Sequence, residues 1–192
     1  MEGVIEYIDV KYPKAELTKL FNEVNPTKGL DYIECGTESY VLSMNPNYYV
    51  MWEHIIEWCT NIHPQLCEMG TGFNSNPTLT SGVPPHIDFD ERKGNKFNLL
   101  LPLFGVAKIG IYETIPEQLE FRHGKTHWNM LQDQYPPNKI GELVLDKPAL
   151  LNTDYLHSVK VIDAPRAIFC VAWRGINMSY NEFKDYAEKT LT

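Results

Sequence analysis

The sequence is poor in cysteine, and none of the four cysteines among its 192 residues lies in a CxxC pair. That spacing provides neither a disulfide framework nor a cysteine-based zinc site, so reduced thiols are expected. No apolar run approaches the about 18 residues that a membrane span requires. The N-terminal residues also lack the basic and then apolar pattern of a signal peptide. Together these absences predict a cytoplasmic protein that does not insert into membranes.

Basic residues are also in the minority: 17 lysines and arginines stand against 25 aspartates and glutamates, for a formal net charge of −8. A negatively charged surface repels phosphate backbones, which disfavours nucleic acid as a partner. The expected partner is therefore a small molecule or the side chain of another protein.

Residues that build a core are abundant, because 43% of the chain is hydrophobic and 12% is aromatic. We expect one domain, residues 1–192, with three regions. Residues 1–80 form an α/β support region, residues 81–175 the β core, and residues 176–192 a C-terminal helix or tail. In the support region the patterns predict a strand over Gly3–Val10, a helix that starts near Pro13, and a second helix over 47–62.

Short β-rich runs follow one another after residue 80, and turn residues separate most of them. The runs are Val83–Phe89, Phe97–Leu103, Lys108–Tyr112, Glu142–Leu145, Ala149–Thr153, His157–Ile162 and Ala167–Trp173. Such a succession predicts a mainly β, jelly-roll-like fold rather than a repeated βαβ unit. The polar stretch from Pro116 to Lys139 breaks the strand rhythm, and we interpret it as an insertion near the mouth of a site.

The motif His86-Ile87-Asp88 lies on the first of these runs. Residues two apart on a strand project to the same face, so His86 and Asp88 can point into one cavity. An imidazole nitrogen and a carboxylate oxygen at this spacing can bind adjacent positions on one metal ion. The triplet alone is weak evidence, since a surface strand with polar residues produces it too.

A second histidine, His157, stands at the edge of a later strand, and Arg166 follows it nine residues on. A turn at Asp163–Pro165 would lay the strand that starts at Arg166 antiparallel beside the strand that starts at His157. Arg166 would then reach the same cavity, where its planar fork suits a carboxylate. Taken singly, His157 could be a core histidine and Arg166 an ordinary charge at a strand end.

Two histidines and one carboxylate leave half of an octahedron open. This set, His86, Asp88 and His157, is typical of non-haem Fe(II) oxygenases, whose free positions accept a co-substrate and dioxygen. Zinc instead favours a closed tetrahedron or a single open position.

These residues on a background of short strands resemble the 2-oxoglutarate/Fe(II)-dependent dioxygenase superfamily. The resemblance covers about residues 80–175, and the run from Gly141 to Trp173 is most similar to the aspartyl/asparaginyl β-hydroxylase-like and prolyl-hydroxylase-like branches. It implies a double-stranded β-helix, an Fe(II) ion on His86, Asp88 and His157, and a hydroxylase that uses 2-oxoglutarate. Arg166 would pair with the distal carboxylate of 2-oxoglutarate. Many members have a serine two residues after this arginine, whereas this chain has Ile168.

Asn98 and Tyr112, on neighbouring strands, are candidates to hydrogen-bond the co-substrate. Their alternatives are an outward polar residue and a core aromatic. Within the insertion, the candidates for substrate binding are His123, His127 and Trp128. A polar loop without a role in binding is the alternative for this segment.

Two other classes of function remain open at this point. The chain could be a catalytically silent β-helix protein that serves as a binding or structural module, although such a module has no need of three ligands and an arginine. It could also be a cupin-like metalloenzyme that does not use 2-oxoglutarate, and Arg166 is the feature that argues against this.

Overall fold

The computed structural model describes residues 3–24, 32–34, 39–42, 66–74, 82–88, 93–114, 119–122, 125–128 and 138–191. The helices there are α1 (Lys14–Val24) and α4 (Tyr180–Leu191), and neither is long and apolar enough to cross a membrane. The strands are β1 (Ile5–Tyr7), β2 (Tyr32–Glu34), β3 (Ser39–Leu42), β4 (Leu66–Asn74), β5 (Gly82–Asp88), β6 (Asn95–Tyr112), β7 (Leu119–Arg122), β8 (Lys125–Trp128), β9 (Lys139–Leu145), β10 (Ala149–Asn152) and β11 (Leu156–Ile176). The predicted helix over 47–62 lies outside the described residues.

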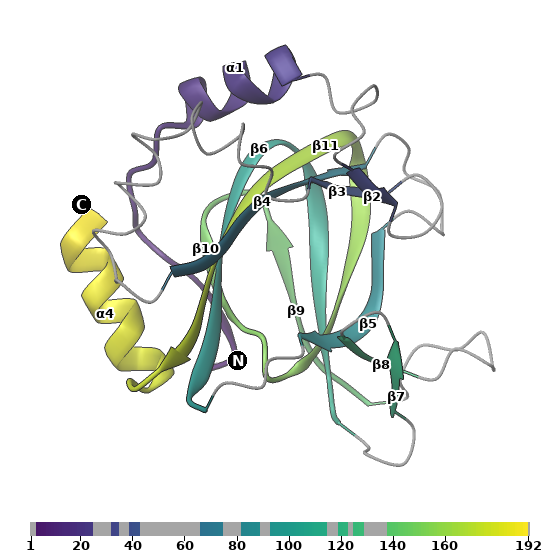
Figure 1. Ribbon diagram of the computed structural model, residues 1–192, viewed down its shortest axis with the longest axis vertical. Helices are drawn as coiled ribbons and strands as arrows, with labels where there is room; N and C mark the ends of the chain where they lie inside the picture. The colour runs from purple at the N-terminus through teal and green to yellow at the C-terminus, as the bar shows by residue number, and fades with distance from the viewer. Residues whose placement is uncertain are drawn as a thin grey trace.

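The strands form two antiparallel layers, and the long strands β6 and β11 run through both (Figure 1). In the first layer, the second half of β11 lies between β4 and the first half of β6. The first half of β6 also pairs with β10, and β1 pairs with β10 at that end of the layer. At the other end, β3 pairs with β4, and β2 pairs with β3. In the second layer, the first half of β11 pairs with β5 and with the second half of β6, which also pairs with β9. The result is a double-stranded β-helix, so the predicted mainly β jelly-roll fold is confirmed.

Both long strands bend at the same place, where each passes from one layer to the other. Gly105 of β6 has a φ of 68°, and a Cβ there would come within 2.4 Å of the Pro165 carbonyl oxygen and 2.6 Å of Arg166 Cα. Only glycine allows this conformation and this approach. The predicted antiparallel pairing between the two halves of β11 is therefore wrong, because each half pairs with a different half of β6.

Two apolar clusters fill the fold. One lies between α1, α4 and the outer face of the first layer, where Phe183 of α4 stacks on Phe97 with a centroid distance of 4.8 Å and packs on Trp173. The other lies between the two layers and includes Leu100, Ile109 and Ile168. The first layer is thus buried on both faces, which explains the long apolar runs of β6 and β11.

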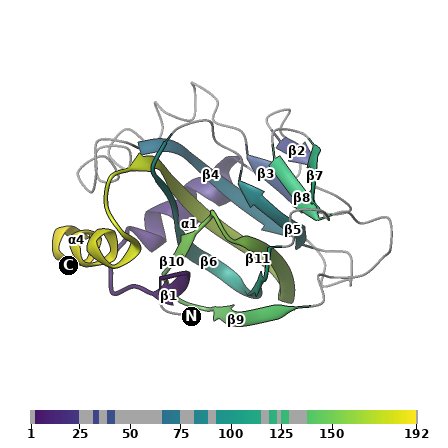
Figure 2. The ribbon, with the colours of Figure 1, turned by 90° about the horizontal axis from the view of Figure 1, so that it is seen from below.

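Two elements depart from the sequence-based expectations. β4 belongs to the first layer although it precedes the range 81–175 predicted for the β core. The predicted insertion 116–139 contains the β7–β8 hairpin, and β8 pairs with β5, so this segment is not simply a loop. Figures 1 and 2 both show β5, β8 and β7 on the side of the molecule opposite α4.

Candidate metal centre

His86, Asp88 and His157 meet between the two layers, and each offers one ligand atom within 4.8 Å of the others. All three are buried, with exposed fractions of 4%, 5% and 3%. His86 and His157 face each other across the β5–β11 pair, and their ring centroids are 4.3 Å apart. Nε2 of His86 lies 3.5 Å from Oδ1 of Asp88. The structure therefore brings together the three predicted ligands.

Strand alternation places these side chains on one face. Ile87, between the two β5 ligands, packs instead with Leu156 and Tyr112. On β11, Leu156 likewise precedes His157 and faces the opposite way. Polar groups therefore point inward at this end of the β-helix, while the apolar residues between them point outward.

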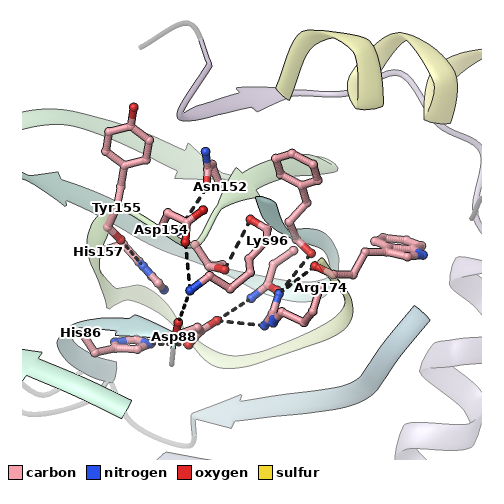
Figure 3. A network of polar contacts seen from close by, with 12 residues as sticks. His86, Asp88, Lys96, Asn152, Asp154, Tyr155, His157 and Arg174 are labelled. Carbon is pink, nitrogen blue, oxygen red and sulfur yellow. Dashed lines mark hydrogen bonds and ion pairs between the residues drawn. The ribbon is translucent and has the colours of Figure 1, made fainter. Parts of the chain in front are cut away.

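A main-chain hydrogen bond sets the orientation of His157. Its Nδ1 lies 2.8 Å from the carbonyl oxygen of Tyr155, which can only accept, so Nδ1 carries the proton. In the neutral ring Nε2 then has the lone pair that a metal needs, an arrangement common among histidine ligands. Figure 3 shows His157 turned toward His86 and Asp88, while the Tyr155 ring points away.

Two side chains hold Oδ2 of Asp88. Nη2 of Arg174 and Nδ2 of Asn98 each lie 3.2 Å from this oxygen. Nη1 of Arg174 also donates to Oδ1 of Asn98 at 2.8 Å, which closes a three-residue network of buried groups. Arg174 was not predicted from the sequence. In the sequence it has the pattern of an ordinary charge near a strand end, and no local signal marks it.

Lys96 links Asp88 to the turn between β10 and β11. Its Nζ donates to the main-chain oxygen of Asp88 at 2.9 Å and forms an ion pair with Asp154, also at 2.9 Å. An Asn152 side-chain oxygen accepts from the Asp154 amide and shapes the same turn. Because Tyr155 of this turn orients His157, one short turn supports ligands from both β5 and β11.

The donor set suits a divalent transition-metal ion. It consists of two imidazole nitrogens and one carboxylate oxygen, from His86, His157 and Asp88. Two histidines and a carboxylate on one face of an octahedral ion are the ligand set of non-haem Fe(II) oxygenases, and imidazole with carboxylate also suits Mn(II).

Arg166 is buried at the bend of β11, eight residues before Arg174 on the same strand. Burial lowers its pKa to about 10, and the nearby Cys170 acts in the opposite direction. Cys170 packs against the apolar cluster between the layers and is half-buried. The strand thus carries two buried guanidinium groups, one beside Asp88 and one at its bend.

The other candidate residues have different positions. Asn98 contacts Asp88, as described above. Tyr112 packs with Ile87 and Leu156, on the opposite face of the second layer from the ligands, and its hydroxyl bonds Ser158 at 3.1 Å. We therefore no longer include Tyr112 among the co-substrate residues.

Among the substrate candidates, His123 lies outside the described residues. His127 and Trp128 belong to β8, where His127 pairs in register with His86. The β7–β8 hairpin therefore continues the second layer directly beside the metal ligands.

No family model and no curated protein sequence matches this chain. Among solved structures, it is similar to the epimerase SnoN in complex with Fe3+, α-ketoglutarate and nogalamycin RO. The TM-score is 0.58 at 10% identity, and the match covers 88% of this chain and 78% of SnoN. It is also similar to HygX from Streptomyces hygroscopicus with nickel, 2-oxoglutarate and hygromycin B bound, with a TM-score of 0.51, 11% identity and coverage of 92% and 84%.

A further match is the ribosomal oxygenase YcfD of Escherichia coli, at a TM-score of 0.42 and 11% identity; the match covers 73% of this chain but only 32% of YcfD. At these identities, the first two likenesses establish the jelly-roll fold.

Proposed function

We propose that this protein is a non-haem Fe(II)- and 2-oxoglutarate-dependent oxygenase that hydroxylates a small molecule or a protein side chain. The observation that supports this best is the buried set of two histidines and one aspartate on facing strands, with their ligand atoms within 4.8 Å. His86, Asp88 and His157 would hold the iron ion. Bound there with its co-substrate, iron supplies the dioxygen chemistry, while the chain binds, orients and excludes water.

The balance of charges favours an anionic co-substrate. Among the described residues, three buried cations, Lys96, Arg166 and Arg174, lie on the strands β6 and β11, and one buried carboxylate, Asp88, lies on β5. Asp154 balances Lys96, but its side chain is 39% exposed. A divalent metal adds positive charge beside these groups, which suits the binding of a dianion such as 2-oxoglutarate.

Arg166 is the residue that we assign to the distal carboxylate of the co-substrate. Its guanidinium is buried, with 5% exposed, at the bend of the strand that also carries His157, and its planar fork can bind a carboxylate through two charge-assisted hydrogen bonds. We assign Asn98 to the support of Asp88 rather than to direct co-substrate contact, because its amide nitrogen donates to Oδ2.

The β7–β8 hairpin is our candidate for substrate recognition. β8 extends the second layer from β5, and its register puts Lys125 opposite Asp88 and His127 opposite His86. Segments attached to a rigid β scaffold next to a site commonly carry binding residues. We therefore keep His123, His127 and Trp128 as candidate substrate residues.

The test is the conversion of 2-oxoglutarate to succinate by the purified chain with added Fe(II) and dioxygen. We expect Fe(II)-dependent succinate release, and, in a screen of small molecules and peptides, a product heavier by one oxygen atom. Metal binding without any consumption of 2-oxoglutarate would contradict the proposal and favour a cupin-like metalloenzyme. Failure to bind a divalent metal would favour a silent binding module.

A further inference from the structure

The two oxygens of the Asp88 carboxylate have different surroundings. Oδ1 lies on the side of the histidines, 3.5 Å from Nε2 of His86. Oδ2 accepts hydrogen bonds from Arg174 and Asn98, both at 3.2 Å. The carboxylate is therefore oriented so that one oxygen is directed to the metal centre and the other to a charged donor.

Arg174 is itself held in place. Its Nη1 donates to the side-chain oxygen of Asn98 at 2.8 Å and to the main-chain oxygens of Trp173 and Phe97 at 3.2 and 3.4 Å. Only 5% of Arg174 is exposed, and it comes from β11 while Asn98 comes from β6. Since strands of the first layer fix both donors, the guanidinium cannot follow Asp88 if the carboxylate rotates.

A carboxylate can give a metal ion one oxygen or two. To give two, Asp88 would have to withdraw Oδ2 from Arg174 and Asn98, and this would leave buried donors unsatisfied. Leaving a buried charged donor without its acceptor is costly, and charge-assisted hydrogen bonds are the strong ones. The network therefore opposes two-oxygen binding.

We propose that Arg174 is a positioning residue that, with Asn98, reserves Oδ2 so that Asp88 gives the metal a single oxygen. This inference rests on the proposed function, because it concerns how the iron site is kept open. With one oxygen from Asp88, an octahedral ion keeps about three positions for exogenous ligands, and with two oxygens it keeps about two. A chelating co-substrate and dioxygen together need the larger number.

Mn(II) provides the test, because its bound water can be counted by water-proton relaxation without any turnover. We expect about three exchangeable waters on Mn(II) in the parent protein and about two in Arg174→Met, where Oδ2 is released to the ion. Mn(II) affinity in this variant should hold or rise, because a positive charge near the ion is removed and an oxygen ligand is gained. Arg174→Lys keeps the charge and one donor, and should restore the parent water count.

The control is Lys184→Met, which removes a cation from an ion pair with Glu6 in the α4 region and should change neither water count nor affinity. An unchanged water count in Arg174→Met would overturn the inference. So would a loss of Mn(II) affinity of about ten-fold or more, which is the usual result when a merely structural partner of a ligand is removed.

Should Arg174→Met not fold, the Lys variant and Asn98→Ala decide the question by the same count. In that case an unchanged count in Asn98→Ala would overturn the inference. Failure of the parent protein to bind Mn(II) would instead overturn the proposed function itself, and the inference with it.

Discussion

Arg174 and Arg166 lie eight residues apart on β11 and are equally buried, yet their surroundings differ. Arg174 is bound to a carboxylate of the chain, Asp88, in a network that a second strand completes. Arg166 lies at the bend, where burial is the largest influence on its pKa and lowers it to about 10. The proposed function assigns them different anions: Arg174 supports Asp88 of the chain itself, and Arg166 would bind the distal carboxylate of the co-substrate.

The largest effect is expected when a metal ligand is removed, because the proposed roles of both arginines depend on the bound ion. His157→Ala deletes a ligand that the Tyr155 carbonyl orients, and we expect it to abolish measurable Fe(II) binding and succinate formation. Metal binding measured by calorimetry checks the result, with Lys184→Met as a folded control. Normal turnover by His157→Ala would mean that the metal centre is elsewhere.

The second prediction sets the two arginines against each other in the metal-free protein. Arg174→Met leaves Asp88 buried without its charged partner, and the expected loss in the free energy of unfolding is about 3–5 kcal/mol. If Arg166 serves an incoming anion, as proposed, Arg166→Met should cost clearly less. Urea unfolding of both variants measures the difference. Equal losses would show that Arg166 also serves a permanent anion of the chain.

The third prediction concerns the incoming anion. Arg166→Lys keeps a charge but loses the planar fork, so affinity for 2-oxoglutarate should fall about ten-fold to a hundred-fold, which corresponds to the about 1.5–3 kcal/mol of a charged hydrogen bond. Mn(II) affinity should persist. A variant with unchanged dependence on 2-oxoglutarate would count against our assignment of Arg166.

The smallest effect is expected for the ion pair between Lys184 and Glu6, which involves neither arginine. The hydrogen bond from Lys184 lowers the pKa of Glu6. The ion pair therefore stabilises the fold fully at pH values above the ordinary pKa of a glutamate, and this contribution is lost as the pH falls through the lowered pKa. Because both side chains are partly exposed, Lys184→Met should cost at most about 1 kcal/mol at neutral pH. Thermal or urea unfolding at neutral and acid pH measures it.

Sequence patterns were sufficient to predict which residues share a face where polar and apolar residues alternate on a short strand. His86 and Asp88 sit two apart on β5, so local spacing was enough to place these two on one face, and the pairing of β5 with β11 brings His157 beside them. The jelly-roll fold followed from the succession of apolar runs. Conversely, β4 contains Gly70 and Gly72 and shows little alternation, and its place in the first layer depends on pairing with a strand about 100 residues later.

Long-range geometry decided what the sequence did not reveal. Arg174 lies near the end of β11 and has the pattern of an ordinary charge. The pairing of β11 with β6 brings it beside Asn98, and its contact with Asp88 of β5 spans the two layers. Tyr112 was assigned to the site from its strand alone, but the register turns it to the other face. The bend at Gly105 and Pro165 likewise places the two halves of β11 in different layers, where a hairpin was predicted.

The measurement that tests the central claim most directly is calorimetric titration of 2-oxoglutarate into the parent protein, with and without Mn(II). If His86, Asp88 and His157 hold the metal that 2-oxoglutarate chelates, saturable one-to-one binding requires Mn(II) and disappears in His157→Ala. Binding of equal affinity without metal would contradict the account, and so would the absence of binding by a protein that has taken up Mn(II).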